Sequence, residues 1–231
     1  MHDDQNRPDL ALFLASAAHD MKNSVGMLSG TLETLLADDA AKQTPAYQQM
    51  AHMLYETRRL NDNLIQLLAL YKDVGTPSYP FDPQPQQLDY LVEQVQAQNG
   101  ILLDSKNIVL EVDCPEGLVW IFDEDLVIGV VGHAINNAIR YTLDKIRLVA
   151  RPGEEFLELR VEDNGRGYPQ AMIDAGMSIK SGVDFTTGST GLGLYFSSEV
   201  AKMHRHRGRQ GSVFLENGGT FGGGCFVLRL P

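Results

Sequence analysis

Apolar residues recur at alternating intervals of three and four along most of residues 10–72, and this heptad pattern constrains the fold more than any other feature. The first series comprises Leu14, Ala18, Met21, Val25, Leu28, Leu32 and Leu35. The second series comprises Met50, Met53, Thr57, Leu60, Leu64, Leu67 and Tyr71. This spacing is typical of helices that supercoil around one another. It predicts two long helices, over residues 8–38 and 46–73.

A short polar segment, DDAAKQTPAY, separates the two series and contains turn-forming Asp and Pro residues. We therefore expect an antiparallel helical hairpin. Further apolar positions widen the stripe beyond a single seam: Phe13, Ala17, Leu36, Leu54 and Leu68. One hairpin buries only part of such a stripe, so a homodimeric four-helix bundle is the expected completion. The alternative is a monomeric hairpin that packs on the rest of the chain.

Prolines mark the end of this region, because residues 73–85 contain Pro77, Pro80, Pro83 and Pro85 and read as a linker. Beyond the linker, helical and strand-like patterns alternate. Helices are expected at 88–99, 124–141 and 193–204, and strands at 107–113, 118–121, 145–151, 155–162, 211–216 and 224–230. The chain as a whole is therefore expected to be α+β, with two domains at residues 1–76 and 77–231.

The charge balance excludes several classes of partner. With 19 Lys and Arg against 30 Asp and Glu, the formal net charge of the 231 residues is −11. A chain this acidic is a poor binder of nucleic acid or of an anionic membrane surface. No stretch approaches the roughly 20 apolar residues that span a bilayer, and the polar N-terminus is unlike a secretory signal. We therefore expect a cytoplasmic protein in which Cys114 and Cys225 are buried thiols.

The motif HDMKN, residues 19–23, combines a nucleophile with groups that can orient it. His19 follows the seam residue Ala18, so its ring should lie beside the helix interface and be reachable from solvent. A neighbouring carboxylate such as Asp20 can bond Nδ1–H and leave Nε2 as the nucleophile. Asn23 lies four residues after His19, on the same helix face. Taken alone, a surface histidine on a helix is usually inert.

Three further motifs suit a phosphorylated nucleotide. One stripe of a predicted helix carries His133, Asn137, Arg140 and Tyr141, and its carboxamide and guanidinium suit magnesium and phosphate oxygens. In DNGRG, the glycines Gly165 and Gly167 let the backbone approach a flat ligand, and Asp163 can accept a hydrogen bond from an amine. GSTGLGL, residues 188–194, places a glycine-rich turn at a helix N-terminus, which presents amides to anions. Each alone also fits an ordinary solvent-facing stripe, turn or loop.

Together, in this order and spacing, the four motifs resemble those of the sensor histidine kinases of two-component signalling. HDMKNSVG resembles the phosphoacceptor H-box, HAINNAIRYT the N-box, DNGRG the G1 box and TGLGL the G2 box. RRLNDNLIQLLALYKDVG resembles the second dimerisation helix, and FVLRLP the last strand. The resemblance covers about residues 10–231. It implies a dimeric four-helix bundle followed by an α/β-sandwich ATP-binding domain of the GHKL, or Bergerat, type.

For the first domain, the resemblance implies that His19 is autophosphorylated with ATP, that Asp20 is its general base and that Asn23 assists dephosphorylation of a regulator. The phosphoryl group would pass to an aspartate in the receiver domain of a response regulator, and phosphatase activity toward that regulator is also expected. Because the two domains use up the chain, we expect input to arrive through a separate sensor protein, a fused operon product or residues 1–9.

For the second domain, the resemblance implies a site for ATP and Mg²⁺. Asn137 would hold the metal, and Asp163 would bind the adenine amine. The other residues that would contact or shape the nucleotide site are Arg140, Tyr141, Gly165, Gly167, Thr190, Gly191, Leu192 and Gly193. Because the chain is acidic overall, we expect Arg140, Lys180 and the glycine-loop amides to form a local positive site.

Three departures from the family pattern leave alternatives open. Ser24 replaces the usual H-box proline, so the helix kink that proline causes should be absent. His133 replaces the first N-box asparagine, and no clear F-box lies between Gly167 and Gly191. The main alternative is a non-enzymatic histidine phosphotransfer or scaffold protein with a vestigial nucleotide-binding domain. A serine kinase of the anti-sigma type is the third hypothesis, which the heptad hairpin disfavours.

The segment HRHRGR, residues 204–209, is a further cluster of histidine and arginine residues. His204 and His206 supply too few ligands for a metal site. The segment is instead expected to form a local basic patch, for partner docking or solvation.

Overall fold

The structure is a computed structural model that describes residues 10–42, 44–71, 81–175 and 192–231. The chain divides into two compact units, Met1–Pro80 and Phe81–Pro231. Within the described ranges, none of the helices combines the length and the apolar character that crossing a membrane requires.

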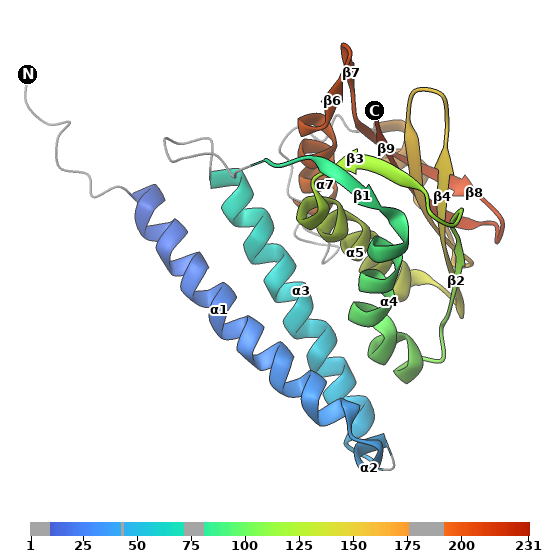
Figure 1. The fold of residues 1–231 in the computed structure, drawn as a ribbon. Helices are drawn as coiled ribbons and strands as arrows, with labels where there is room; N and C mark the ends of the chain where they lie inside the picture. Colours follow the sequence, from blue (N-terminus) through green and yellow to red (C-terminus); the bar gives the residue numbers. More distant parts are fainter. Residues whose placement is uncertain (1–9, 43, 72–80, 176–191) are drawn as a thin grey trace, which may run out of the picture. The chain divides into compact units, whose positions relative to one another are not determined.

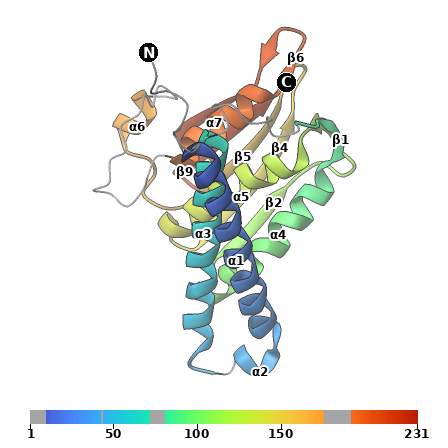
Figure 2. The same ribbon diagram turned by 90° about the vertical axis from the view of Figure 1, so that its left-hand side faces the viewer.

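Two long helices, α1 (Leu10–Ala37) and α3 (Tyr47–Tyr71), form the first unit and are joined through the short α2 (Asp39–Lys42). They run side by side in opposite directions (Figure 1 and Figure 2). The expected pair of helices is therefore present. Helix α1 continues through Ser24 without a break, and the Ser24 hydroxyl donates a 3.0 Å hydrogen bond to the carbonyl of Asp20.

The face that the hairpin buries differs from the expected seam. Leu36 and Leu54 are fully buried, although both lie outside the two heptad series. Among the described side chains of those series, Met21, Leu28, Leu35, Met53 and Leu60 are each at least half exposed. The contact between α1 and α3 therefore leaves these five residues of the series uncovered. The physical reason is that the apolar stripe is wider than one helix–helix contact can cover.

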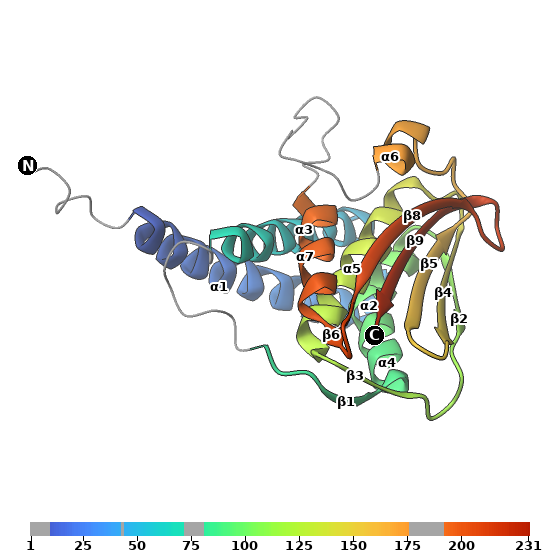
Figure 3. The same ribbon diagram turned by 90° about the horizontal axis from the view of Figure 1, so that it is seen from above.

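A five-stranded sheet with the order β2-β4-β5-β9-β8 is the framework of the second unit. Its strands are β2 (Val109–Asp113), β4 (Lys145–Pro152), β5 (Leu157–Asp163), β8 (Ser212–Gly218) and β9 (Gly223–Leu230). Strand β2 pairs parallel with β4, and the other neighbours pair antiparallel. Helices α4 (Leu88–Ser105), α5 (Glu124–Tyr141) and α7 (Leu192–Met203) cover one face of the sheet (Figure 3), which gives a two-layer α/β sandwich.

The hydrophobic core fills the space between the sheet and its helices. Leu148, Val161 and Phe226 are register partners across three adjacent strands, and all three are buried. Side chains alternate between the two faces of a strand, so Arg160 lies on the face away from this row. There the Arg160 guanidinium bonds three carboxylates, of Glu158, Glu162 and Glu216. This charged network covers the sheet face that the helices leave open.

Several elements lie outside the sequence expectations. Strand β1 (Gln84–Gln87), partly assigned to the linker, pairs antiparallel with β3 (Val119–Phe122) in a two-stranded ribbon, where a proline is tolerated because a strand has an open edge. Helix α4 continues to Ser105, and a hairpin of β6 (Arg205–His206) and β7 (Arg209–Gln210) follows α7. A short helix, α6 (Gln170–Ala175), follows β5. Cys225 is buried, but Cys114 is partly exposed, so the expectation of two buried thiols is wrong for Cys114.

Candidate functional site

Helix α5 carries the polar stripe of the candidate site. The Asp123 carboxylate caps its N-terminus by accepting a 3.1 Å hydrogen bond from the amide of Leu126. Acidic residues in the first turn and Arg140 in the last turn match the helix dipole. The opposite face packs into the core through Val127, Val130, Val131, Ala134, Ile135, Ala138 and Ile139. Packing on one face therefore fixes which way the polar stripe is directed.

His133 and Asn137 form one hydrogen-bonded pair, one turn apart on this stripe. Asn137 Nδ2 lies 2.9 Å from His133 Nε2. Burial lowers the pKa of His133 to about 4, so the ring is neutral at pH 7. A neutral ring nitrogen can accept the amide proton of Asn137, which leaves Asn137 Oδ1 as the acceptor side of its carboxamide. His133, which departs from the N-box pattern, thus orients the side chain of Asn137.

Gly193, near the start of α7, lies directly against the His133 ring. A β-carbon built on Gly193 would overlap Nε2 and Cε1 of His133. Only a residue without a side chain allows this approach. The contact joins the G2-box segment to the N-box segment, since Gly193 and His133 are 60 positions apart in the sequence.

Asp163, the last residue of β5, is buried and held by backbone amides. Its Oδ1 accepts hydrogen bonds from the amides of Gly165, at 2.7 Å, and Gly224, at 3.2 Å. A β-carbon on Gly224 would lie 2.7 Å from Asp163 Oδ2. The carboxylate is therefore fixed by two glycine segments, one inside its own motif and one on the neighbouring strand β9.

The end of α5 and the DNGRG turn are packed together at Tyr141. A β-carbon on Gly165 would overlap the Tyr141 carbonyl oxygen, so this glycine is needed for a close backbone approach. The guanidinium groups of Arg140 and Arg166 lie 5.4 and 5.5 Å from the centroid of the Tyr141 ring. Two cations therefore gather around one aromatic ring at the edge of the site.

Two asparagines for which no role was expected, Asn164 and Asn217, help to position the site. Asn164 Oδ1 accepts hydrogen bonds from three consecutive amides, those of residues 143–145, and from the Thr142 hydroxyl. Asn217, on β8, bonds both the amide and the carbonyl of Tyr168, and it fills the space in front of Gly167, whose φ is +77°. Asn164 stood within a recognised motif, whereas no sequence signal marked Asn217.

The remaining expected site residues are placed as follows. Asp20 and Asn23 are exposed on α1, which also contains His19, whose side chain lies outside the described part of the chain. Thr190, Gly191 and Lys180 lie outside the described residues, and Leu192 begins α7. The structure therefore forms two groups of contacts within the second unit, Gly193 with Asn137 through His133 and Asp163 with Tyr141 through Gly165, and helix α5 carries both Asn137 and Tyr141.

Comparisons with known proteins agree with this arrangement. Residues 122–231 match the family model described as histidine kinase-, DNA gyrase B- and HSP90-like ATPase. The chain is 27% identical over 227 residues to the sensor-like histidine kinase SenX3 of Mycolicibacterium smegmatis, covering 95% of this chain and 56% of that protein. It is 26% identical over 201 residues to the phosphate regulon sensor protein PhoR of Pseudomonas aeruginosa, covering 84% of this chain and 45% of that protein.

A solved structure extends the similarity of fold to both units. The histidine kinase AdeS of Acinetobacter baumannii matches with a TM-score of 0.56 and 18% identity, covering 92% of this chain and 96% of that one. The resemblance to sensor histidine kinases is thereby confirmed, and the second unit has the α/β fold of their ATP-binding domain. The chain spans about half the length of the curated relatives it matches.

Proposed function

We propose that this chain is an ATP-dependent protein histidine kinase, which autophosphorylates His19 and passes the phosphoryl group to an aspartate of a response regulator. The observation that carries the proposal is the series of contacts that joins Gly193, His133 and Asn137 and then, one helical turn on, Tyr141, Gly165 and Asp163. Three motifs from distant parts of the sequence thus meet around one end of α5. Residues 1–76 serve dimerisation and phosphate acceptance, and residues 77–231 bind ATP.

Asp163 is suited to select adenine. Its Oδ1 is occupied by the amides of Gly165 and Gly224, which leaves Oδ2 to accept a hydrogen bond from the exocyclic amine of the base. Because the carboxylate is already oriented, binding costs little side-chain entropy. Tyr141 lies beside the nucleotide. The guanidinium groups of Arg140 and Arg166 around its ring supply positive charge near the phosphates.

Asn137 fits the expected role in holding Mg²⁺. An amide oxygen is a ligand that Mg²⁺ accepts, and the bond from Nδ2 to neutral His133 directs Oδ1 away from the ring. When bound, the metal neutralises charge on the phosphate oxygens. The resemblance assigns Thr190, Gly191, Leu192 and Gly193 to the nucleotide site as well, and Gly193 is the one whose contact with His133 supports this.

His19 is the nucleophile of the proposed reaction. Its Nε2 forms a bond to the γ-phosphorus while the bond from that phosphorus to the β,γ-bridging oxygen breaks, so that ADP leaves. Asp20 accepts a hydrogen bond from Nδ1–H of His19 and so holds the reactive tautomer before the attack. As the bond from Nε2 to phosphorus forms, Asp20 takes this proton as the general base. Asn23, on the same helix face, positions a water or the phosphoryl group when the regulator is dephosphorylated.

The exposed apolar residues of the first unit support the homodimeric four-helix bundle. Met21, Leu28 and Leu35 recur every seven residues on α1, and Met53 and Leu60 do so on α3. Both rows are exposed in the single chain, and a second hairpin that covered them would remove this apolar stripe from water.

Titration calorimetry with a non-hydrolysable ATP analogue and Mg²⁺ tests the proposal and separates it from a vestigial nucleotide domain. We expect saturable binding that requires Asp163 and weakens when Mg²⁺ is removed. If no heat of binding is measured at millimolar analogue, the kinase hypothesis fails, and the phosphotransfer protein that receives its phosphoryl group elsewhere takes its place.

A further inference from the structure

A cavity of about 370 Å³ lies in the second unit at the other end of α5 from the nucleotide motifs. His204, which lines it, accepts a hydrogen bond at Nε2 from the amide of Asp123, the cap of α5, at 3.0 Å. Tyr141 ends the same helix, and 18 residues of α-helix span about 27 Å. We call this cavity the groove; it separates the β1–β3 ribbon from the β6–β7 hairpin. Its position excludes it from the proposed ATP site.

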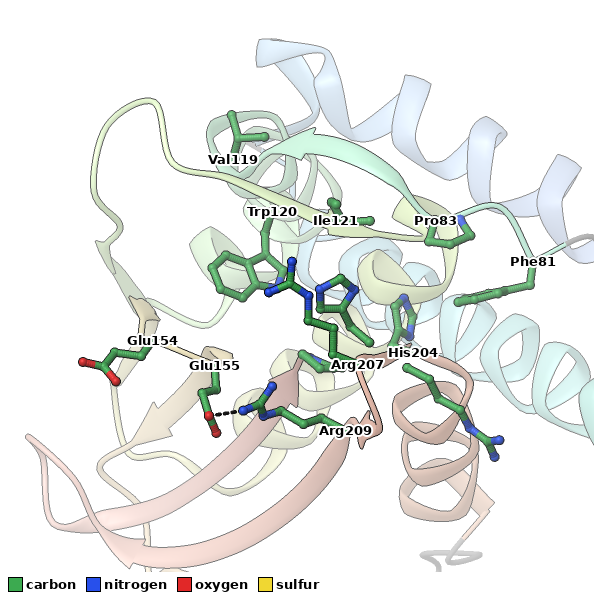
Figure 4. A pocket seen from close by; sticks show the side chains of 13 residues that line it. Phe81, Pro83, Val119, Trp120, Ile121, Glu154, Glu155, His204, Arg207 and Arg209 are labelled. Carbon is green, nitrogen blue, oxygen red and sulfur yellow. Dashed lines mark hydrogen bonds and ion pairs between the residues drawn. The ribbon is translucent and has the colours of Figure 1, made fainter.

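One wall of the groove is apolar and offers an open strand edge. Strand β3 contributes Val119, Trp120 and Ile121, and Figure 4 shows Trp120 directed into the groove. Val119 and Ile121 are 47% and 53% exposed, so part of the apolar surface of β3 is open to solvent. Within the described part of the chain, β3 pairs with β1 alone, so its second edge has no strand partner.

The facing wall is basic. Arg205, Arg207 and Arg209 line it from the β6–β7 hairpin, and Figure 4 shows Arg207 and Arg209 on the side of the groove that faces Trp120. Arg209 is paired with Glu155, and Arg205 Nε donates a 3.1 Å hydrogen bond to the carbonyl of Lys202. Among the described residues, no hydrogen bond or ion pair engages the Arg207 guanidinium. Free positive charge at this wall stands out in a chain with a net charge of −11.

The hairpin that presents these arginines is held in place. Its two-residue turn has φ values of +48° at Arg207 and +79° at Gly208, as a type I′ turn requires. Gln210 Nε2 donates a 2.8 Å hydrogen bond to the carbonyl of Lys202, and the amide of Gly211 donates one of 2.9 Å to the carbonyl of His204. The hairpin backbone that carries the arginines is therefore preorganised, which reduces the entropy lost on binding.

We infer that the groove is a docking site for an extended acidic segment of a partner protein. The open edge of β3 supplies backbone groups for an added strand. Trp120 supplies an apolar anchor, and Arg205 and Arg207 pair with carboxylates of the segment. Glu154 and Glu155 on the rim repel a dense polyanion, which favours a peptide with a few carboxylates over a nucleic acid.

Trp120 is the one tryptophan of the 231 residues, so its fluorescence reports directly on the groove. The probes are three octapeptides of alternating sequence, Glu-Val, Gln-Val and Lys-Val, added to the full chain without nucleotide. We expect the Glu-Val peptide to change Trp120 emission saturably, with an affinity about tenfold or more above that of the Gln-Val peptide. Calorimetry on the same samples detects any binding that leaves the emission unchanged.

Matched variants localise the binding. Replacing Arg205 and Arg207 together by Glu should reduce the affinity for the Glu-Val peptide at least about tenfold. Lys106→Glu, a single charge reversal of the same kind in the loop after α4, should leave this affinity at the wild-type value. Thermal unfolding checks that each variant is folded. A saturating ATP analogue should not displace the peptide, because the groove and the nucleotide motifs lie at opposite ends of α5.

Three results would overturn the inference: no binding of the Glu-Val peptide by either method, equal binding of the Lys-Val peptide, or wild-type affinity in the double variant. Displacement of the peptide by millimolar citrate with matched emission changes would also overturn it, because the groove would then be a small-anion site. Failure of nucleotide binding leaves this inference untouched, since the readout requires no ATP.

Discussion

Among the described residues, backbone amides and no cation hold the Asp163 carboxylate, and this decides what a substitution there will do. Its Oδ1 accepts from Gly165 and Gly224, so the side chain keeps its place through two short contacts with main chain. The same logic applies at Gly193, which is in contact with His133 because it has no side chain. At the residue scale, the proposed nucleotide site is built from side chains and glycines in close contact with backbone and ring atoms. Substitutions that change one or a few atoms therefore test the role of each contact.

Asp163→Asn should weaken ATP-analogue binding by about ten- to a hundredfold while leaving thermal stability close to that of the wild type. A carboxamide oxygen can still accept from the amides of Gly165 and Gly224, but its NH₂ group then faces the exocyclic amine of adenine, where a donor meets a donor. Titration calorimetry gives the affinity. Asp174→Asn, on exposed α6, is the control and should bind like the wild type; an unchanged affinity in Asp163→Asn would contradict the assigned role.

Gly193→Ala should lower the free energy of unfolding by about 1–3 kcal/mol and weaken Mg²⁺-dependent nucleotide binding. The added methyl group overlaps the His133 ring, so the ring has to move and its bond to Asn137 is disturbed. Urea denaturation and calorimetry measure the two effects. Gly100→Ala is the matched control, because a β-carbon there meets no atom within 4 Å and alanine is the better helix former. If the two variants had equal free energies of unfolding, the close contact between Gly193 and His133 would not contribute to stability.

The stability of the second unit should decrease as the pH falls below about 6.5. His204 is buried, donates from Nδ1 to the carbonyl of Val200 and accepts at Nε2 from Asp123, so it has no room for a second proton. Burial lowers the pKa of His204 below its usual 6.5. The unfolded chain therefore binds a proton that the folded chain does not, and the stability that this difference provides is present above pH 6.5 and lost as the pH falls.

Urea unfolding at about pH 7.5 and about pH 5.5 measures this dependence, and the free energy of unfolding should be lower at the lower pH. His133, whose pKa is also lowered, contributes with the same sign. His204→Gln keeps an acceptor for the Asp123 amide without a titrating group and should show a smaller loss. His52→Gln, at an exposed position on α3, should retain the full wild-type loss; the same loss in both variants would assign the effect to other groups.

At the element scale, the sequence predicts best the elements whose signals are local. Helix α5 begins and ends where expected, at Glu124 and Tyr141, because a capping aspartate, acidic first-turn residues and an apolar stripe all agree. Strand β1 could not be predicted, since Gln84–Gln87 has no alternation and becomes a strand only by pairing with β3. The heptads predicted the helices but not which apolar residues face each other, because that choice depends on the partner helix.

The residues of the candidate site also divide into those with a local sequence signal and those whose role depends on the tertiary structure. Asp163, Gly165 and the α5 stripe were recognisable because each motif is contiguous in the sequence. The positioning roles of Asn164 and Asn217 arise only from the tertiary arrangement, through bonds that cross 19–22 and 49 positions of the chain. An isolated asparagine carries no pattern that distinguishes such a role from an ordinary turn.

Leu28→Lys should weaken self-association about a hundredfold or more, because a two-fold dimer contains the substitution twice and each buried leucine contributes about 2 kcal/mol. Sedimentation velocity over a range of concentrations measures the monomer–dimer equilibrium. Thr34→Lys places the same charge on an exposed position of α1 away from the Leu28 row and should leave the dimer intact. Equal dimer stability in the two variants would show that the exposed apolar row is not the interface.

At the scale of the whole molecule, the chain combines a helical unit that carries the phosphoacceptor motif with an α/β unit that carries the nucleotide motifs. Charge is distributed unevenly in the second unit, since arginines gather at Tyr141 at one end of α5 and along the groove at the other. A protein of net charge −11 thus holds two local basic sites, which we propose serve nucleotide and partner separately.

The most direct measurement is phosphate incorporation from γ-labelled ATP into the purified full chain, with Mg²⁺ present. The account predicts labelling of the wild type that is lost under acid, as a phosphohistidine requires, and that is absent in His19→Ala. His52→Ala, the matched control on the other long helix, should be labelled like the wild type. Label retained by His19→Ala would contradict the central claim, because the phosphoryl group would then be held by a different residue.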